Sequence, residues 1–434
     1  MSSCYDELIR RNLIYHISDE GLIKRLNAGE KEPITFYIGF DPTSHSLHVG
    51  HLLQIMLIIQ LLKFGHKPIV VLGGATALIG DPSGRATERP IIEESQVMSN
   101  VEKISTQLEG ILNNFELTTD EKITVCNNLS WWKDMNVVAY LRDVGRLATV
   151  NQMLAKESVH RRVSEENQSI SYAEFSYMLL QAYDFLHLYR TENCTLQCGA
   201  SDQWGNISQG LDLIRRSCGD EKVFGLTTPL VVKPDGTKFG KSSTGTVWLD
   251  GELTRPFELY QYFINIDDLS VITFLKYFTF LTVDEIESIE KESTTRPKDR
   301  IAHKRLSYEV VKNVHGKEIA ENVQAASNAI FGTAPFEELS DDVFELLMVE
   351  LNGISVNFKD LRAREIESID SFLVSFGVVK SKSEVGRLIT QKGLMLNENK
   401  DLSLGTKISE IKPYLGKYIV IKVGKKNYSI VKVL

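Results

Sequence analysis

The chain has 434 residues, of which 43% are hydrophobic and 24% charged, and this length predicts two or three globular domains rather than one. The apolar run at residues 52–62 is shorter than the roughly 20 residues that span a membrane, and the first residues form no signal segment, so we expect a cytoplasmic protein with no membrane partner. Five scattered cysteines without a Cys-x-x-Cys pair argue against a disulfide framework and a structural zinc site, and the net charge of −8 argues against nucleic-acid binding unless the charge is unevenly distributed.

The first informative stretch is a predicted strand, turn and helix. Residues 34–40 are β-branched and aromatic, which predicts a buried strand, and residues 52–62 predict a buried helix. The sequence His-Val-Gly-His lies between them, so His48 and His51 share one face of the first helical turn. Unpaired backbone N–H groups and the positive end of the helix dipole suit phosphate oxygens there, and Gly50 would let an adenine ring or a phosphate approach the backbone. The alternative is that both histidines are capping or core residues.

A second strand is predicted at residues 68–72, and it opens into a glycine-rich turn at residues 73–84. Strand, helix and strand of this length predict a parallel unit, in which ligands bind at the carboxyl ends of the strands. Asp81 lies in this turn, either as a ligand contact or as a simple Asp-Pro turn residue. Residues 93–164 are predicted to be a mainly helical insertion between two halves of the sheet and a candidate dimer surface.

Tyr177, Gln181 and Asp184 stand at i, i+4 and i+7, so they form one stripe on a helix predicted at residues 174–189. A solvated face usually carries Lys, Glu or Arg, but no Lys or Arg occurs in this stretch. A hydroxyl, an amide and a carboxylate instead suit a small zwitterionic or phenolic ligand. Residues 195–206 then repeat the pattern of strand, glycine turn and helix start, which makes Asp202 a ribose ligand or a helix N-cap.

Residues 226–245 contain a strand, a Pro-Asp-Gly turn, and then Lys238, Lys241 and Ser242 among glycines and hydroxyls. Two ammonium groups on a loop are suited to closing over a triphosphate, although Lys-x-x-Lys-Ser alone is also a common surface sequence.

The end of the chain is basic. Residues 371–434 contain 12 Lys and Arg and 4 Asp and Glu, giving 12 − 4 = +8, so the remainder carries −8 − 8 = −16. A basic appendage on an acidic body is typical of a protein that contacts nucleic acid through one part. The alternative is a solubilising tail, but apolar alternation and turn signals predict that this part is folded.

Together these motifs resemble class I aminoacyl-tRNA synthetases, because the His-Val-Gly-His turn is similar to the HIGH signature and Lys238 to Ser242 is similar to the KMSKS loop. Three further blocks, Gly-Phe-Asp-Pro-Thr, Ser-Tyr-Met-Leu-Leu-Gln-Ala-Tyr-Asp-Phe and Ser-Asp-Gln-Trp-Gly-Asn, extend the resemblance to the bacterial-type tyrosyl-tRNA synthetase family over about residues 5–434. The resemblance implies an α/β fold: a Rossmann-like parallel-sheet catalytic domain with a helical insertion (1–245), a helical anticodon-side domain (246–331), an acidic linker (332–368) and a small α+β RNA-binding domain (369–434). In the last domain we expect a helix at residues 380–390 and a hairpin at residues 394–402.

The resemblance also implies a reaction: ATP-dependent attachment of L-tyrosine to tRNA(Tyr) through a tyrosyl-adenylate, by a homodimer, with Mg²⁺ accompanying ATP and no metal held by the protein. A carboxylate is already a nucleophile, so the protein must position it and neutralise charge on the phosphates. The residues implied for catalysis are Thr43, His48, His51, Lys238 and Lys241. Those implied for tyrosine are Tyr37 and Asp184 on the phenolic hydroxyl, Asp81, Tyr177 and Gln181 around the α-ammonium, and Gln203 near the carboxylate. Those implied for ATP are His48, Gly50, His51, Asp202, Lys238, Lys241 and Ser242.

Two departures from the family pattern are visible. The signatures read His-Val-Gly-His and Lys-Phe-Gly-Lys-Ser, which keeps every charged group, and Ala200 stands where a glycine is expected near the ribose. Two other functions remain open: an RNA-binding protein descended from a synthetase, which intact Lys238, Lys241, His48 and His51 disfavour, and a synthetase for another aromatic amino acid such as tryptophan, which the polar pair Tyr37 and Asp184 disfavours.

Overall fold

The computed structural model describes residues 3–84, 87, 89–115, 123–164, 169–219, 222–233, 236–237, 239–242, 245–332, 334–363, 365–424 and 427–434. Contacts divide the chain into two compact units. The first comprises Met1–Arg255 and Tyr262–His315, and the second Pro256–Gln261 and Gly316–Leu434. The finer division into four domains stays a prediction.

The first unit is built on a six-stranded sheet in the order β1-β6-β5-β2-β3-β4. All neighbouring strands pair in parallel except β1, which runs antiparallel to β6 at the edge. After β2 the chain continues to β3 on one side of the sheet, and after β5 it continues to β6 on the other side. The strand order therefore reverses between β2 and β5, and ligands of such sheets bind at the carboxyl ends of the two strands at this point. The strands are β1 (His16–Ile17), β2 (Thr35–Phe40), β3 (Lys67–Leu72), β4 (Thr124–Asn127), β5 (Cys194–Ala200) and β6 (Phe224–Thr228).

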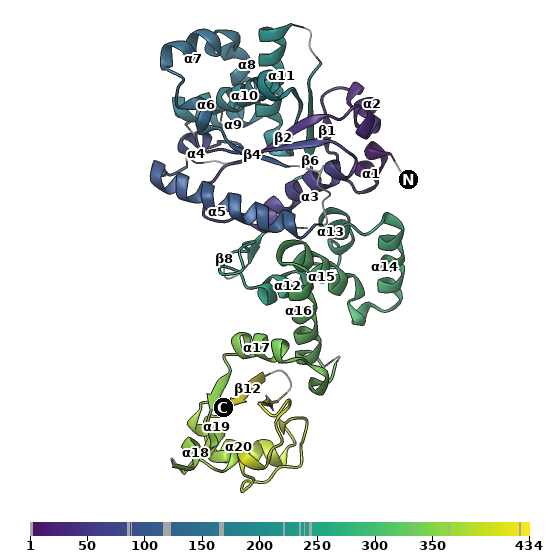
Figure 1. Ribbon diagram of the computed structural model, residues 1–434, viewed down its shortest axis with the longest axis vertical. Coiled ribbons are helices and arrows are strands. Elements are labelled where there is room, and N and C mark those ends of the chain that lie inside the picture. The colour runs from purple at the N-terminus through teal and green to yellow at the C-terminus, as the bar shows by residue number, and fades with distance from the viewer. Residues whose placement is uncertain are drawn as a thin grey trace. The chain divides into compact units, whose positions relative to one another are not determined.

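Helices cover both faces of this sheet. Figure 1 shows α10 and α11 on one face and α3 and α5 on the other. The strand and helix predicted around the His-Val-Gly-His turn are confirmed as β2 and α3, and the side chains of α3 are buried almost all round, as its continuous apolar sequence requires. In the described part of the chain, no helix combines the length and hydropathy that crossing a membrane would need. The helices up to α11 are α1 (Cys4–Arg10), α2 (Gly21–Ala28), α3 (Val49–Lys63), α4 (Thr76–Ile79), α5 (Glu94–Asn113), α6 (Leu129–Trp132), α7 (Val137–Asp143), α8 (Val150–Leu154), α9 (Glu157–Ser164), α10 (Tyr172–Glu192) and α11 (Trp204–Cys218).

The predicted helical insertion is partly wrong. Residues 93–164 are mainly helical, but they also contain β4, which pairs in parallel with β3 and forms an edge of the sheet. The strand is only four residues long and partly exposed, so its sequence, Thr-Val-Cys-Asn, carries too little hydrophobic periodicity to be recognised. Consequently Asn127 and Asn128, which the sequence placed in a break between helices, stand at the carboxyl edge of the sheet.

A short β-ladder and a helical group complete the first unit. The ladder joins β7 (Lys241–Ser242) to β8 (Gly245–Thr246) in antiparallel register. The helices that follow are α12 (Pro256–Ile264), which spans the boundary between the units, α13 (Val271–Phe278), α14 (Val283–Thr295) and α15 (Ile301–His315).

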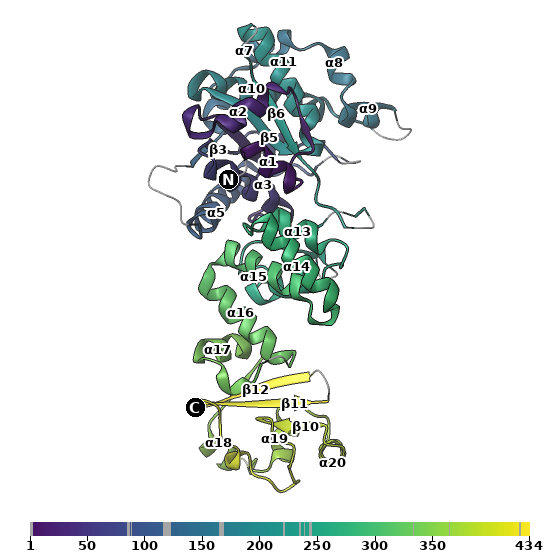
Figure 2. The same cartoon turned by 90° about the vertical axis from the view of Figure 1, so that its right-hand side faces the viewer.

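The second unit is a four-stranded sheet in the order β10-β11-β12-β9, with helices on both faces (Figure 2). Tyr418 on β11 stacks on Phe344 of α17 with ring centroids 4.5 Å apart, and its hydroxyl donates to Asp341 at 2.9 Å, so α17 is fixed to the sheet. The elements are α16 (Lys317–Ile330), α17 (Asp341–Glu350), β9 (Ile354–Val356), α18 (Phe358–Ala363), α19 (Ile369–Ser375), α20 (Lys382–Thr390), β10 (Leu394–Leu396), β11 (Tyr418–Val423) and β12 (Asn427–Val433).

The structure corrects two predictions for this region, the acidic linker and the hairpin at residues 394–402. The span expected to be an acidic linker supplies α17 and β9, and β9 pairs in parallel with β12, so much of it is folded with the basic tail. The hairpin expected at residues 394–402 is reduced to one bridge between Leu396 and Asn399, because β10 pairs instead with β11. The helix expected at residues 380–390 is confirmed as α20.

Candidate active site

The His-Val-Gly-His turn forms a reciprocal cap at the start of α3. Nδ1 of His48 accepts a hydrogen bond from the Gly50 N–H at 3.1 Å, and Nδ1 of His51 accepts one from the His48 N–H at 3.2 Å. The two rings stack with centroids 3.9 Å apart. Because both Nδ1 atoms accept, each neutral ring carries its proton on Nε2. The histidines are therefore capping residues that also present N–H donors, so the two interpretations of this motif are compatible.

Burial sets the protonation state of His51, and the ring of His48 limits the space beside Gly50. Burial holds the pKa of His51 well below its usual value, with the neighbouring His48 contributing, so the ring is neutral at physiological pH. A Cβ atom added to Gly50 would lie 2.8 Å from Cε1 of His48, so a side chain there would displace the capping ring. Thr43 lies in the loop between β2 and this turn, where its N–H donates to the Asp41 carbonyl at 2.8 Å.

The segment from residue 239 to residue 249 returns to this turn, about 190 residues further along the chain. Lys238 lies outside the described residues, and for Lys241 and Ser242 the backbone alone is described, as strand β7. A Cβ atom added to Gly240 would lie 2.9 Å from Cγ2 of Val49, and the Val49 N–H donates to the Val247 carbonyl at 3.1 Å. The structure thus brings the two signature segments together.

An aromatic cluster holds the base of this segment. The Phe239 ring is buried, with its centroid 4.6 Å from Phe274 and 5.8 Å from Phe263. The Gly240 N–H donates to the Tyr262 hydroxyl at 3.1 Å. Phe239 stands between the two lysine positions in the sequence, so this anchor fixes the described backbone at residues 239–242.

The stripe predicted on α10 faces the sheet edge. The carboxylate of Asp184 is buried and accepts three hydrogen bonds: from Asn128 Nδ2 at 3.0 Å, from Trp131 Nε1 at 2.8 Å and from Trp132 Nε1 at 2.8 Å. Burial raises the pKa of Asp184 to about 7, although these three donors favour the charged form. The charge of Asp184, together with burial, keeps the pKa of the buried Tyr37 hydroxyl well above its usual value.

A second polar group lies around Asp81. Its carboxylate accepts from Gln203 Nε2 at 2.7 Å and from the Ser83 N–H at 2.9 Å, so Asp81 is both a turn residue and a member of the cluster. Asn206 on α11 joins the group, because its Nδ2 lies 3.0 Å from Gln181 Oε1 and 3.1 Å from Gln203 Oε1. Residues from the segment after α4, from α10, from the 3-10 helix Ser201–Gln203 and from α11 therefore meet in one hydrogen-bonded cluster.

Asp41 is joined to the Asp184 group by hydrogen bonds, and the charge of Asp81 acts on it electrostatically. The Tyr177 hydroxyl donates to Asp41 at 2.7 Å, and the Thr76 hydroxyl donates to the same carboxylate at 2.7 Å. Asn128 Nδ2 lies 3.1 Å from the Thr76 hydroxyl, which continues the chain of hydrogen bonds to Asp184. Burial raises the pKa of Asp41 to about 6 despite the two hydroxyl donors.

Asp202 and Ala200 lie where β5 ends. Asp202 falls inside a short 3-10 helix, Ser201–Gln203, whose N-cap is Ala200, so Asp202 is not the N-cap of that helix. Ala200 has an ordinary extended backbone, with φ −78° and ψ 165°, so glycine is not needed there.

The sequence missed five polar residues of this site. They come from three places: the loop directly after β2, the segment after β4, and α11. Asp41 stands directly after a predicted strand, a signal that was available, whereas the others depended on recognising β4 or on the packing of α11 against α10. The five are Asp41, Asn128, Trp131, Trp132 and Asn206.

Metal binding can be tested against the donors present. Across the described ranges, no group of three or more His, Cys, Asp or Glu side chains is placed to hold a metal ion. The carboxylates of the site, Asp41, Asp81 and Asp184, instead accept hydrogen bonds from hydroxyl, amide and indole donors.

The fold is that of a class I tRNA synthetase, and comparison with known proteins agrees. Residues 29–332 match the family described as tRNA synthetases class I (W and Y), and residues 353–431 match the tyrosine–tRNA ligase SYY-like C-terminal domain. The chain belongs to the tyrosine–tRNA ligase family.

The similarity to individual relatives covers almost the whole chain. A tyrosine–tRNA ligase of Roseiflexus castenholzii is 42% identical over 434 residues, covering 100% of both chains, and one of Geobacillus stearothermophilus is 44% identical over 431 residues, covering 98% of both. Among solved structures, a C-terminally truncated Aspergillus nidulans mitochondrial tyrosyl-tRNA synthetase is 32% identical with a TM-score of 0.69, over 76% of this chain and 95% of that one.

Proposed function

We infer that this protein attaches L-tyrosine to tRNA(Tyr) at the expense of ATP, through a tyrosyl-adenylate. The observation that carries this inference is that two features lie at the carboxyl edge of one sheet: a buried cluster of polar side chains on α10, and the capped start of helix α3, where backbone N–H groups suit phosphate oxygens. The match of residues 353–431 to a tyrosine–tRNA ligase domain supports tyrosine over tryptophan, and full-length similarity to ligases argues against an RNA-binding protein without catalysis.

The polar residues of the site provide hydrogen-bond partners for both the phenolic end and the amino-acid end of tyrosine. Asp184 and Tyr37 contact the phenolic hydroxyl, because both are buried polar groups and the charge of Asp184 acts on the Tyr37 hydroxyl. Asp81, Tyr177 and Gln181 surround the α-ammonium, since Asp81 supplies a carboxylate and the other two supply oxygen atoms. Gln203, which already donates to Asp81, lies near the substrate carboxylate.

The nucleotide lies over the start of α3. His48 and His51 donate N–H groups to phosphate oxygens, and Thr43 lies in the preceding loop. Lys238 and Lys241 place positive charge beside the β- and γ-phosphates, which leave as pyrophosphate and gain negative charge as the tyrosine carboxylate attacks the α-phosphorus. Gly50 and Ser242 line the same region, and Asp202 accepts from the ribose.

Mg²⁺ enters this scheme with ATP. Magnesium prefers oxygen ligands and commonly binds through substrate phosphates rather than through a protein cage. When bound it neutralises phosphate charge, while His48, His51, Lys238 and Lys241 orient the phosphates from the protein side.

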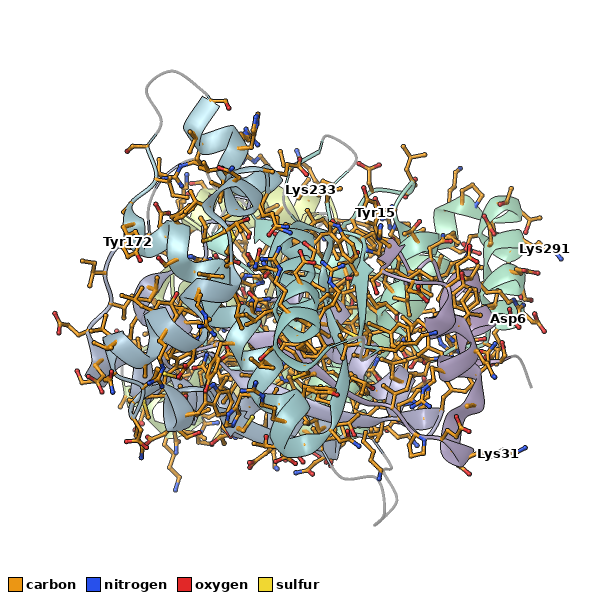
Figure 3. The ribbon with its side chains drawn as sticks, turned by 90° about the horizontal axis from the view of Figure 1, so that it is seen from above. Asp6, Tyr15, Lys31, Tyr172, Lys233 and Lys291 are labelled. Atoms are coloured by element: carbon orange, nitrogen blue, oxygen red, sulfur yellow. The ribbon has the colours of Figure 1, made fainter. Side chains whose placement is uncertain are left out.

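The protein acts as a cytoplasmic homodimer whose contact surface is the helical segment between β4 and α10. This surface exposes large apolar side chains in the described structure, as buried interfaces require. Figure 3 shows Tyr172, which is 73% exposed, pointing outward at the start of α10. The other large exposed apolar residues of this segment are Val137, Val138, Leu141, Val150, Leu154 and Val163.

Pyrophosphate exchange into ATP, run against all amino acids, tests the activity. We expect exchange with tyrosine and, in the presence of tRNA(Tyr), charging. Asp184→Asn should lower kcat/KM for tyrosine by at least about tenfold and hardly affect the weak activity with phenylalanine, because the lost partner is that of the phenolic hydroxyl. Exchange that is equal for tyrosine and phenylalanine in the unmutated protein would overturn the assignment of the pocket.

A further inference from the structure

The two oxygens of the Asp184 carboxylate are used unequally. Two indole N–H groups, from Trp131 and Trp132, both donate to Oδ1 at 2.8 Å, whereas Oδ2 accepts, among the described residues, only from Asn128 at 3.0 Å. An ionised carboxylate offers about four lone-pair sites, two on each oxygen. Oδ1 is therefore fully used by the two indoles, and Oδ2 retains one site.

We propose that Trp132 is a positioning residue for the substrate hydroxyl: with Trp131 it occupies both lone pairs of Oδ1, so that Oδ2 of Asp184 is the acceptor for the phenolic O–H. This inference rests on the proposed assignment of Asp184 to that hydroxyl. Without Trp132, Oδ1 keeps a free lone pair and the carboxylate of Asp184 binds a proton more readily, so Oδ2 is an acceptor for the substrate hydroxyl only at higher pH.

The orientation of Trp132 is set by the structure around it. Its ring lies 4.9 Å from the ring of Tyr183, the neighbour of Asp184 on α10, and 5.9 Å from the ring of Tyr140 on α7. Trp131 is held separately, stacked on His187 with centroids 4.5 Å apart. Trp131 and Trp132, which are adjacent in α6, thus donate their indole N–H groups to the same oxygen of Asp184 while their rings pack on different aromatic residues.

Removing one of these donors has a predictable electrostatic result. Each N–H stabilises the carboxylate relative to the carboxylic acid, so the loss of one raises the pKa of Asp184 above its present value of about 7. Asp41 acts in the same direction, because its negative charge also raises this pKa. The other titratable groups near Asp184 are Tyr37, Cys126, Tyr177, Tyr183 and, behind Trp131, His187.

The test is the ratio of kcat/KM for tyrosine to kcat/KM for phenylalanine, measured from well below to well above pH 7 in Trp132→Phe and the unmutated protein. Ionisations that change kcat/KM equally for tyrosine and phenylalanine cancel in this ratio. Phenylalanine at residue 132 keeps an aromatic ring but has no N–H. We expect the midpoint of the ratio to move up by about one pH unit, which makes the ratio about tenfold lower at low pH, with the two curves converging at high pH.

Two further variants make the result specific. Tyr140→Phe keeps the ring against Trp132 and removes a buried hydroxyl with no hydrogen-bond partner among the described residues, so its profile should match that of the unmutated protein. Trp131→Phe removes the other donor to Oδ1 and should shift the profile in the same direction as Trp132→Phe, which provides a second reading if Trp132→Phe folds poorly.

The outcomes separate this inference from the proposed function. A Trp132→Phe profile that coincides with the unmutated one, or a loss that is equal for both substrates at every pH, would overturn the role of Trp132 as a hydrogen-bond donor. If instead Asp184→Asn leaves the tyrosine-to-phenylalanine ratio unchanged, the assignment of Asp184 to the substrate hydroxyl is itself wrong.

Discussion

At the scale of single residues, the site contains two carboxylic acids, Asp184 and Asp41, whose ionisation is disfavoured by burial. Asp184 and Asp41 lie in one chain of hydrogen bonds, and burial raises the pKa values of both, to about 7 and about 6. Donors around each carboxylate offset part of this cost, since a buried charge is tolerated only when it is hydrogen-bonded. The site therefore holds two carboxylates whose charge changes with pH near neutrality.

This sensitivity predicts how stability varies with pH. In the folded state Asp184 binds its proton up to about pH 7, whereas the unfolded chain releases it near the ordinary value of 3.8. The folded state thus binds more protons in this window, and the contribution of Asp184 to stability falls as pH rises from about 4 to about 7, by up to about 4 kcal/mol.

The Asp184→Asn variant should lack this contribution. We expect the Tm of the variant, relative to that of the unmutated protein, to rise progressively as pH increases from about 4 to about 7. Thermal unfolding without substrates, at matched ionic strength, measures the difference. A difference between the two proteins that does not change with pH would mean that Asp184 ionises normally in the folded state.

At the scale of elements, the two signature segments are joined by contacts of their backbones. The base of the lysine segment is anchored by Phe239 in an aromatic cluster and lies against Val49, at the start of α3. This arrangement holds the backbone of β7 near the helix start that the nucleotide is proposed to occupy. The amino-acid pocket, by contrast, is built from α10, α11 and the segment after β4.

This separation predicts the behaviour of Lys241→Ala. Adenylate formation should slow by at least about a hundredfold while the affinity for tyrosine changes little, because an ammonium on this segment acts on the triphosphate in the transition state. Pre-steady-state adenylate formation and equilibrium binding of tyrosine measure the two effects separately. Lys233→Ala, in the same segment, is the matched control and should leave both nearly unchanged. A collapse of tyrosine affinity with normal reaction of the bound complex would show that Lys241 is misassigned.

At the scale of the whole molecule, the acidic and basic parts of the chain fall largely into different compact units. The proposed pocket and phosphate residues all belong to the first unit, and the basic tail belongs to the second. A basic domain contacts tRNA phosphates with an affinity that falls as salt rises, because bound counterions are released. Activation of tyrosine and charging of tRNA should therefore depend on different parts of the chain.

A chain that ends at Gly332 tests this division. It should form tyrosyl-adenylate at nearly the full rate but charge tRNA at least about tenfold more slowly, with a weaker dependence on salt than the full chain. A cut after residue 367 is less suitable, since it would leave α17 and β9 without β11 and β12, on which they pack. Pyrophosphate exchange and tRNA charging across a salt series provide the measurement. Undiminished charging with the same salt dependence would exclude the basic tail as the tRNA contact.

The sequence by itself determined the features that local chemistry encodes. A β-branched strand, an apolar helix and the capping pair His48 and His51 follow from short-range periodicity, and the stripe Tyr177, Gln181 and Asp184 follows from helical spacing. The tertiary structure decided which distant groups meet. Trp132 and Asp184 are 52 residues apart, and they come together only because the weak strand β4 joins the sheet beside β3 and directs the following residues toward α10. Likewise β10 pairs with β11 rather than folding back on its own chain. Such pairings are selected by burial across the whole sheet, a quantity that no local window of sequence contains.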